Sequence, residues 1–96
     1  MIRHIVFFSA REGNGVEAVR DGLKALAAIP HSRVFEVALN SKTDPLSDEV
    51  DVVVYGEFDD EAALAAYKAH PLYAETTAKV RPLRELRVSA DFFSPN

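Results

Sequence analysis

The chain has 96 residues, a formal net charge of −4 at pH 7 and no cysteine. Hydrophobic residues make up 48% of it, which is typical of a globular protein, and its length favours one domain over residues 1–96. The negative charge argues against nucleic acid as a main partner, and the lack of cysteine excludes disulfides and fits a reducing cytoplasm. The opening "MIRHIVFFSAREG" holds one apolar run of about five residues, too short for a signal peptide or membrane span. We therefore expect a cytoplasmic protein that begins directly with structure and does not enter a membrane.

The first half of the chain predicts a strand, a helix and a second strand. Residues 2–9 are rich in β-branched and aromatic side chains, and the turn residues of "REGNG" follow them. Asn14 is predicted to cap the helix, with Glu17 three residues later as its reciprocal partner. Apolar residues then recur at helical spacing until Pro30 ends the helix, and residues 32–40 predict the second strand.

The second half predicts a loop, a strand, a helix and a last strand. Residues 41–49 are polar and are expected to form a mobile loop. Residues 50–58 predict the third strand, after which Asp59 or Asp60 is expected to cap the next helix. Residues 84–93 predict the last strand.

The resulting order, β-α-β-β-α-β, predicts an α+β protein of the ferredoxin-like class with a four-stranded antiparallel sheet. Right-handed crossovers would place both helices on one face of that sheet. A sheet covered on one face only normally alternates apolar and polar residues along its strands.

The predicted strands do not alternate cleanly: the first and third carry apolar side chains on both faces, and the last carries them on one face. In the first strand, Ile2, Val6 and Phe8 lie on one face and Ile5 and Phe7 on the other. In the third strand, Val52 and Val54 lie opposite Val53 and Tyr55. In the last strand, an apolar face of Leu86, Val88, Ala90 and Phe92 lies opposite Arg87, Ser89 and Asp91. An exposed apolar sheet is unusual for a monomer, so we expect a homodimer, a dimeric α/β barrel whose two sheets pack face to face. The alternative is a monomer with an apolar sheet face.

The stretch "AAYKAHPLYAE" (65–75) predicts a break in the second helix and gathers three polar rings around it. The residue before a proline disfavours helical backbone, so His70 ends one segment, while Pro71 suits the first turn of the next. Tyr67 lies one turn before His70 on the same face, and Tyr73 falls in the first turn after the break. We expect the break to aim these rings at one end of the sheet, together with His4 of the first strand.

Four short stretches, "RHIVFF", "IP", "YKAHPLY" and "SADFF", resemble the stress-responsive dimeric α/β-barrel family, the Dabb domains. The resemblance spans the chain from about Ile2 to Phe92, and the His-Pro pair after a tyrosine is its most specific part. It implies a ferredoxin-like protomer, a dimer closed by face-to-face sheets and, in some members, a pocket between sheet and helices. Many members have no assigned activity.

One branch of the family, the plant polyketide cyclases that close a poly-β-keto thioester by aldol condensation, also resembles this chain. The resemblance matches Tyr67 to the cyclase tyrosine, His70 to the histidine of the His-Pro pair and His4 to a first-strand pocket histidine. This sequence has Tyr73 where the cyclases have their histidine base, and Val52 where they have a second pocket histidine. The base of the cyclases is therefore missing here.

This departure limits the chemistry of the three candidate catalytic residues, Tyr67, His70 and Tyr73. A histidine has by default the pKa that a general base needs, whereas the usual tyrosine pKa is about 10. Tyr73 is better suited to donate a hydrogen bond to a carbonyl oxygen, and His70 is the base if it faces the pocket. The alternatives are that His70 caps the broken helix, that both tyrosines edge the core and that His4 is a structural histidine.

The basic cluster of Lys79, Arg81, Arg84 and Arg87 suits an anion, although a solvated face with salt bridges is the commoner outcome for such a cluster. Strand alternation puts Arg87 on the helix-facing side of the sheet, where it needs a partner from the protein or from a ligand. The three histidines have no metal-ligand spacing, so we expect no metal, and nothing in the sequence indicates a cofactor.

Three functions follow from these features. The first is binding of a small organic molecule in a pocket lined by His4, Val6, Phe8, Val52, Val54, Tyr67, His70, Tyr73 and Arg87. The second is a cofactor-independent enzyme at that pocket, similar to a polyketide cyclase or to the antibiotic-biosynthesis monooxygenases of this fold. The third is a structural stress protein that acts through its assembly.

Overall fold

The computed structural model describes residues 1–95, which form four strands and a set of short helices. In chain order the elements are β1 (Ile2–Ala10), α1 (Val16–Lys24), the 3₁₀ turn η1 (Ala25–Ala28), β2 (Ser32–Leu39), β3 (Val52–Phe58), α2 (Glu61–Ala69), α3 (Pro71–Val80) and β4 (Arg84–Phe93). The predicted β-α-β-β-α-β order is confirmed, with the second helix divided into α2 and α3.

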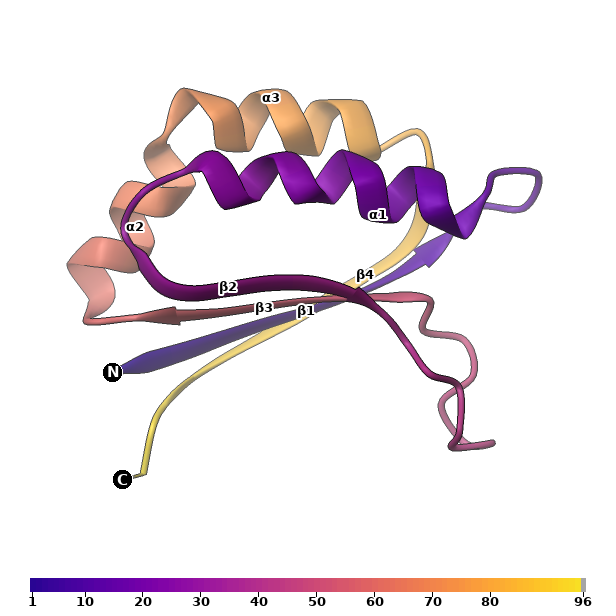
Figure 1. Ribbon diagram of the computed structural model, residues 1–96, viewed down its shortest axis with the longest axis horizontal. Helices are drawn as coiled ribbons and strands as arrows, with labels where there is room; N and C mark the ends of the chain where they lie inside the picture. The colour runs from indigo at the N-terminus through magenta and orange to yellow at the C-terminus, as the bar shows by residue number, and fades with distance from the viewer. Residues whose placement is uncertain (96) are drawn as a thin grey trace.

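The strands form one antiparallel sheet in the order β2-β3-β1-β4, so the first and last strands of the chain lie side by side. All the helices lie on one face of this sheet, and the other face is bare (Figure 1). This is the ferredoxin-like fold that the sequence predicts.

The core lies between the sheet and the helices. Alternate residues of β1 and β3 are buried there, and Val6 pairs with Val54 at the centre of the sheet. Val19 and Leu23 of α1 and Val80 of α3 cover them from the other side. Burial of these aliphatic side chains removes apolar surface from water, which is the main stabilising term for a domain of this size.

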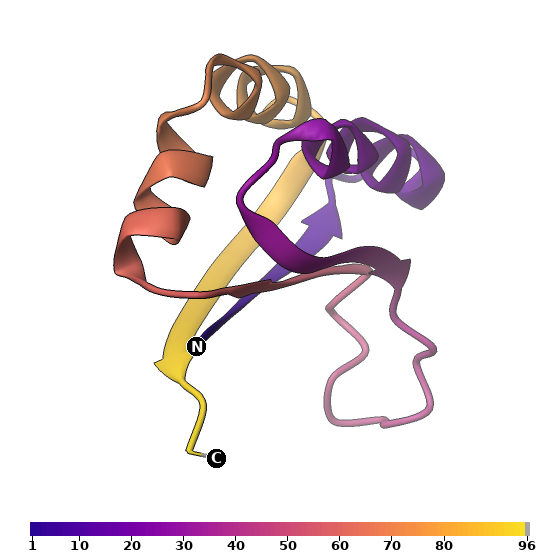
Figure 2. The same cartoon turned by 60° about the vertical axis from the view of Figure 1, so that its left-hand side comes forward.

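The helix-free face is apolar as well. Val88 and Phe92 of β4 are 50% and 41% exposed there, next to half-buried Ile5 and Phe7 of β1. The segment that joins β2 to β3 leaves the sheet toward this same side (Figures 1 and 2). Beside it a hollow of about 230 Å³ is lined by Phe7, Asn40, Ser47, Val50 and Val53.

Two predicted N-caps, at α2 and at α1, can be compared with the structure. Asp60 caps α2, because its side chain accepts a hydrogen bond from the backbone N–H of Ala63 at 2.8 Å. The prediction for Asn14 is wrong: Gly15 is the N-cap of α1, and no side chain caps that helix. Asn14 lies one residue too early, and its backbone N–H instead closes a turn onto the Arg11 carbonyl. Within the described residues, no helix is both long and apolar enough to cross a bilayer.

Candidate functional site

The break between α2 and α3 is built by His70 and Pro71. His70 has extended backbone, with φ −64° and ψ 137°, and Pro71 occupies the first turn of α3. The Nδ1 atom of His70 accepts a hydrogen bond from the backbone N–H of Leu72 at 3.1 Å. The ring therefore caps α3 and satisfies one of the free N–H groups at its start.

Tyr67 occupies the centre of an aromatic cluster beneath this break. Its side chain is 1% exposed, and its ring centroid lies 5.1 Å from that of Phe58, 5.3 Å from Tyr73, 5.8 Å from Phe35 and 6.1 Å from His4. Burial, and then the nearby Tyr73 hydroxyl, raise the pKa of Tyr67 far above its ordinary value. Tyr67 is therefore a neutral hydrogen-bond donor at physiological pH and not a base.

One row of residues crosses the sheet under this cluster: Phe35, Gly56, His4 and Asp91 pair in register from β2 to β4. Gly56 leaves the space that the rings fill, because a Cβ atom there would lie 2.9 Å from the Phe58 ring. The aromatic cluster thus depends on a missing side chain in the sheet.

His4 and Asp91 form a hydrogen-bonded pair within this row. The His4 side chain is 2% exposed, and its Nδ1 atom bonds the Asp91 carboxylate, which is 36% exposed and lies 3.8 Å from the Lys68 ammonium. A carboxylate on one ring nitrogen orients the imidazole and leaves the other nitrogen as the acceptor in the neutral form. Among residues 1–95, no three histidine, aspartate or glutamate side chains are grouped as metal ligands are.

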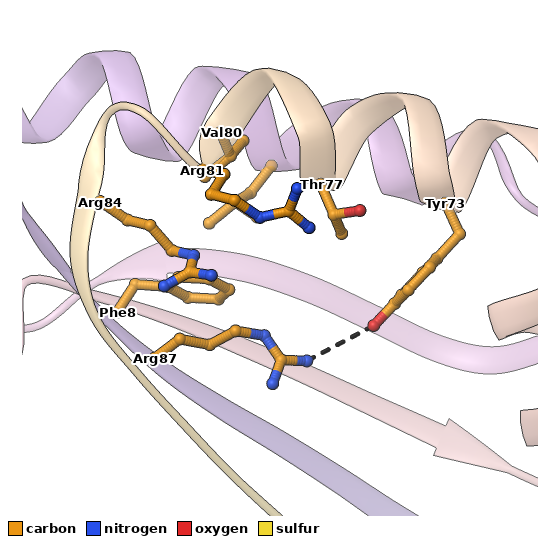
Figure 3. A pocket seen from close by; sticks show the side chains of 8 residues that line it. Phe8, Tyr73, Thr77, Val80, Arg81, Arg84 and Arg87 are labelled. Atoms are coloured by element: carbon orange, nitrogen blue, oxygen red, sulfur yellow. Dashed lines mark hydrogen bonds between the residues drawn. The ribbon is translucent and has the colours of Figure 1, made fainter.

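An open cavity of about 250 Å³ lies between α3, α1 and the β1–β4 side of the sheet (Figure 3). Its apolar wall is formed by Phe8, Leu23 and Val80, and its polar wall by Tyr73, Thr77, Arg81, Arg84 and Arg87. Arg87 donates a long hydrogen bond of 3.4 Å to the Tyr73 hydroxyl. The cavity is slightly smaller than the roughly 300–1,000 Å³ of pockets for drug-sized ligands, so it suits a smaller molecule.

A second hollow of about 10 Å³ continues from this cavity toward the His4–Asp91 pair. The two spaces share Phe8, Leu23, Tyr73, Thr77 and Arg87, and the inner one also borders His4 and Tyr67. This volume is about the minimum that holds one water molecule. A ligand atom can reach His4 only if some of these five shared residues move.

Three arginines lie along one side of the cavity and are here called the arginine triad: Arg81, Arg84 and Arg87 (Figure 3). Arg81 directly follows α3, and Arg84 and Arg87 belong to β4. Burial, and then the charges of Arg87, Arg81 and Arg11, lower the pKa of Arg84 from its ordinary value. The triad is thus a concentration of positive charge in a chain whose net charge is negative.

The structure brings together seven of the nine residues that the sequence suggests for a pocket. The residues that border the cavity or its inner hollow are His4, Val6, Phe8, Val54, Tyr67, Tyr73 and Arg87. Val52 is fully buried in the core and borders neither, and His70 borders neither because its ring caps α3.

Six residues that border the cavity or its inner hollow are not among the pocket residues predicted from the sequence: Leu23, Leu26, Thr77, Val80, Arg81 and Arg84. Arg81 and Arg84 are predicted only as members of the basic cluster. Asp91 borders neither space, but the sequence analysis also missed it as the partner of His4, and the pairing of the first and last strands would have placed the two residues side by side. Thr77 follows Tyr73 by one helical turn, so helix spacing would have found it. Leu23 gave no signal, because a cavity-lining leucine and a core leucine look the same in a sequence.

Comparisons with known proteins agree with this architecture. A dimeric ferredoxin-like protein of unknown function from Thermobifida fusca is 28% identical, with a TM-score of 0.79 over 95% of this chain and 88% of the other. A Dabb family protein with a ferredoxin-like fold from Mesorhizobium loti is 25% identical, with a TM-score of 0.78 over 99% and 97% of the two chains. A structure described as an antibiotic biosynthesis monooxygenase has a TM-score of 0.79 over the whole of both chains, but at 14% identity it shares the fold alone.

No curated protein matches this sequence. The family model of the stress-responsive A/B barrel domain, Dabb, matches residues 2–94. That match covers nearly the whole chain and includes β1, β4 and the helix break between them. The chain therefore belongs to the Dabb family.

Proposed function

We propose that this protein is a homodimer that binds a small organic molecule in the cavity between its sheet and helices. The observation that carries the proposal is the cavity of about 250 Å³, with one apolar wall and one wall of hydrogen-bond donors. Ligand sites typically combine apolar surface with a few polar groups that fix orientation.

The helix-free face of the sheet supports the dimeric part of the proposal. It presents exposed Val88 and Phe92 together with half-buried Ile5, Phe7 and Val53. A second copy of the same face would cover this apolar surface with an isologous contact, and two-fold symmetry is the commonest arrangement for such contacts. Relatives such as the Thermobifida fusca protein are described as dimeric.

Native mass spectrometry on protein purified gently from its own host tests both parts at once. We expect a dimer that carries a defined additional mass. A dimer without any retained mass, and without response to a ligand screen, would contradict binding and favour a role through assembly. A mass that corresponds to a monomer would contradict the proposed homodimer.

A cavity-filling variant makes the binding test specific. Thr77→Phe places a ring in the cavity and should abolish retention of the ligand. Ala78→Phe puts the same ring on the exposed side of α3 and serves as the matched control. Equal retention by both variants would show that the ligand lies elsewhere.

The His4–Asp91 pair favours a second candidate function, a cofactor-independent enzyme at the same site. Asp91 would stabilise the imidazolium that forms when His4 removes a proton from carbon next to a carbonyl group. Neutral Tyr67 would donate a hydrogen bond to the enolate oxygen. The narrow inner hollow would have to open for this chemistry.

Exchange of carbon-bound hydrogen for deuterium tests this second candidate without knowledge of the natural substrate. We expect the protein to accelerate exchange next to the ketone of 4-oxopentanoate, and His4→Gln to reduce that rate on the order of 100-fold. The exposed His31→Gln is the control. Exchange at the buffer rate, or equal rates in both variants, would contradict a base at His4.

A further inference from the structure

The arginine triad has few partners of its own. Among residues 1–95, none of its three guanidinium groups forms an ion pair, and its side chains make a single hydrogen bond, from Arg87 to Tyr73. The acidic residues of α3 and β4 pair with other groups: Glu75 with Lys79 at 3.3 Å, Glu85 with Arg11 at 3.3 Å and Asp91 with His4. Most of the fixed donor groups of the triad are therefore free.

The triad also repels itself. Arg84 is half-buried, and the charges of Arg87 and Arg81 disfavour its protonated form. An anion between the three groups would remove this repulsion, and guanidinium groups bind carboxylate and phosphate oxygens with paired, charge-assisted hydrogen bonds.

We propose that the cavity takes a small organic anion, with its carboxylate or phosphate oxygens on the arginine triad and its apolar body on Phe8, Leu23 and Val80. This inference rests on the proposed binding function and adds the chemical class of the ligand. The Tyr73 and Thr77 hydroxyl groups lie on the same wall and supply further donors to the ligand oxygens.

The two ends of the site differ in their chemistry. The anionic group binds in the outer cavity, where the triad lines the wall, and the inner hollow with His4 and Tyr67 lies behind the shared residues. A short apolar chain on the anion lies along Phe8 and Leu23, which border both spaces.

Calorimetric titration with three probes that share a five-carbon apolar chain tests the inference: hexanoate, pentyl phosphate and the neutral hexanamide. We expect at least one anion to bind about tenfold tighter than hexanamide, and its affinity to fall as salt is raised. Tighter binding of hexanoate would assign a carboxylate, and tighter binding of pentyl phosphate would assign a phosphate ester.

Variants that keep the apolar stem of the side chain identify the residues. Arg84→Met and Arg87→Met should each weaken the preferred anion about tenfold and leave hexanamide within about twofold. Arg33→Met removes the same charge from an exposed ion pair with Asp59, outside the cavity, and should leave both affinities unchanged. Circular dichroism of each variant checks that it is folded.

Two results would overturn the inference in distinguishable ways. Equal affinity for hexanamide and both anions, or wild-type anion affinity in Arg84→Met and Arg87→Met, would refute the anionic class but leave binding in the cavity intact. Absence of binding by all three probes, with no mass retained by the protein from its host, would refute the proposed function as well.

Discussion

The same residue type has different roles in this protein because its surroundings differ. His4 is buried in the sheet and bonds a carboxylate, whereas His70 sits at a helix break and bonds a backbone N–H. Burial likewise decides the chemistry of Tyr67, whose raised pKa keeps the phenol neutral, so that it can donate a proton in a hydrogen bond but cannot accept one as a base. The surroundings of each side chain, and not its residue type alone, therefore decide its role.

Asp51 gives a prediction at the residue scale. Burial alone raises the pKa of Asp51, but hydrogen bonds from Lys42 at 2.6 Å and from the Ala10 backbone N–H at 2.8 Å outweigh it and lower that pKa. The ionised form is therefore favoured in the folded state, and its contribution is present above the unfolded pKa of about 4 and lost as the pH falls through the folded pKa.

We expect Asp51→Asn to lower the free energy of unfolding by about 1 kcal/mol at neutral pH, since Lys42 is partly exposed and its ion pair is screened. Urea unfolding measures this difference, which should be smaller at acid pH, because protonation of the wild-type carboxylate removes the charge as the pH falls below the unfolded pKa of about 4 and through the lowered folded pKa. A difference that is the same at both pH values would refute the role assigned to the charge.

The helix break shows how an element is positioned by its ends. His70 ends α2 and caps α3, and Pro71 fits the first turn of α3, where its missing N–H does no harm. The break turns the chain so that Tyr67 before it and Tyr73 after it meet with 5.3 Å between ring centroids. A continuous helix would place residues six apart on different faces.

Substitution of His70 separates a cap from a catalytic base. We expect His70→Ala to destabilise the protein by about 1 kcal/mol, because the Leu72 N–H loses its acceptor, while His70→Asn retains most of the stability, since asparagine is a good N-cap. Thermal or urea unfolding gives the stabilities, and binding of the probes described above gives the function. If His70→Asn is as stable as wild type but loses ligand or activity, the residue has a role beyond capping.

For the whole molecule, the sheet has two apolar faces and the chain supplies helices for one of them (Figures 1 and 2). The loop between β2 and β3 extends past the bare face and borders a hollow of about 230 Å³ on it. Such a surface suits a second copy of the chain, whose matching face would fill it.

We expect Val88→Asp to convert the proposed dimer to a monomer, because it would bury an unpaired charge between the two sheets. Sedimentation velocity measures the change. Ala78→Asp adds the same charge on the exposed side of α3 and should remain dimeric. A Val88→Asp variant that sediments as the wild type does would place any interface elsewhere.

The sequence alone determined the order of the elements, the break at His70-Pro71 and the helix-facing side of β4, and it narrowed the cap of α2 to Asp59 or Asp60. Each of these features depends on local backbone preference or on strand alternation. Only the tertiary structure decided which polar groups meet. The bond between His4 and Asp91 joins residues 87 positions apart, and the arginine triad lines a cavity whose other wall comes from β1, α1 and α3. The direction of the His70 ring was also left open by the sequence, since spacing along the chain permits this side chain to reach either a pocket or a backbone N–H, and the structure shows the bond to the Leu72 N–H of its own helix.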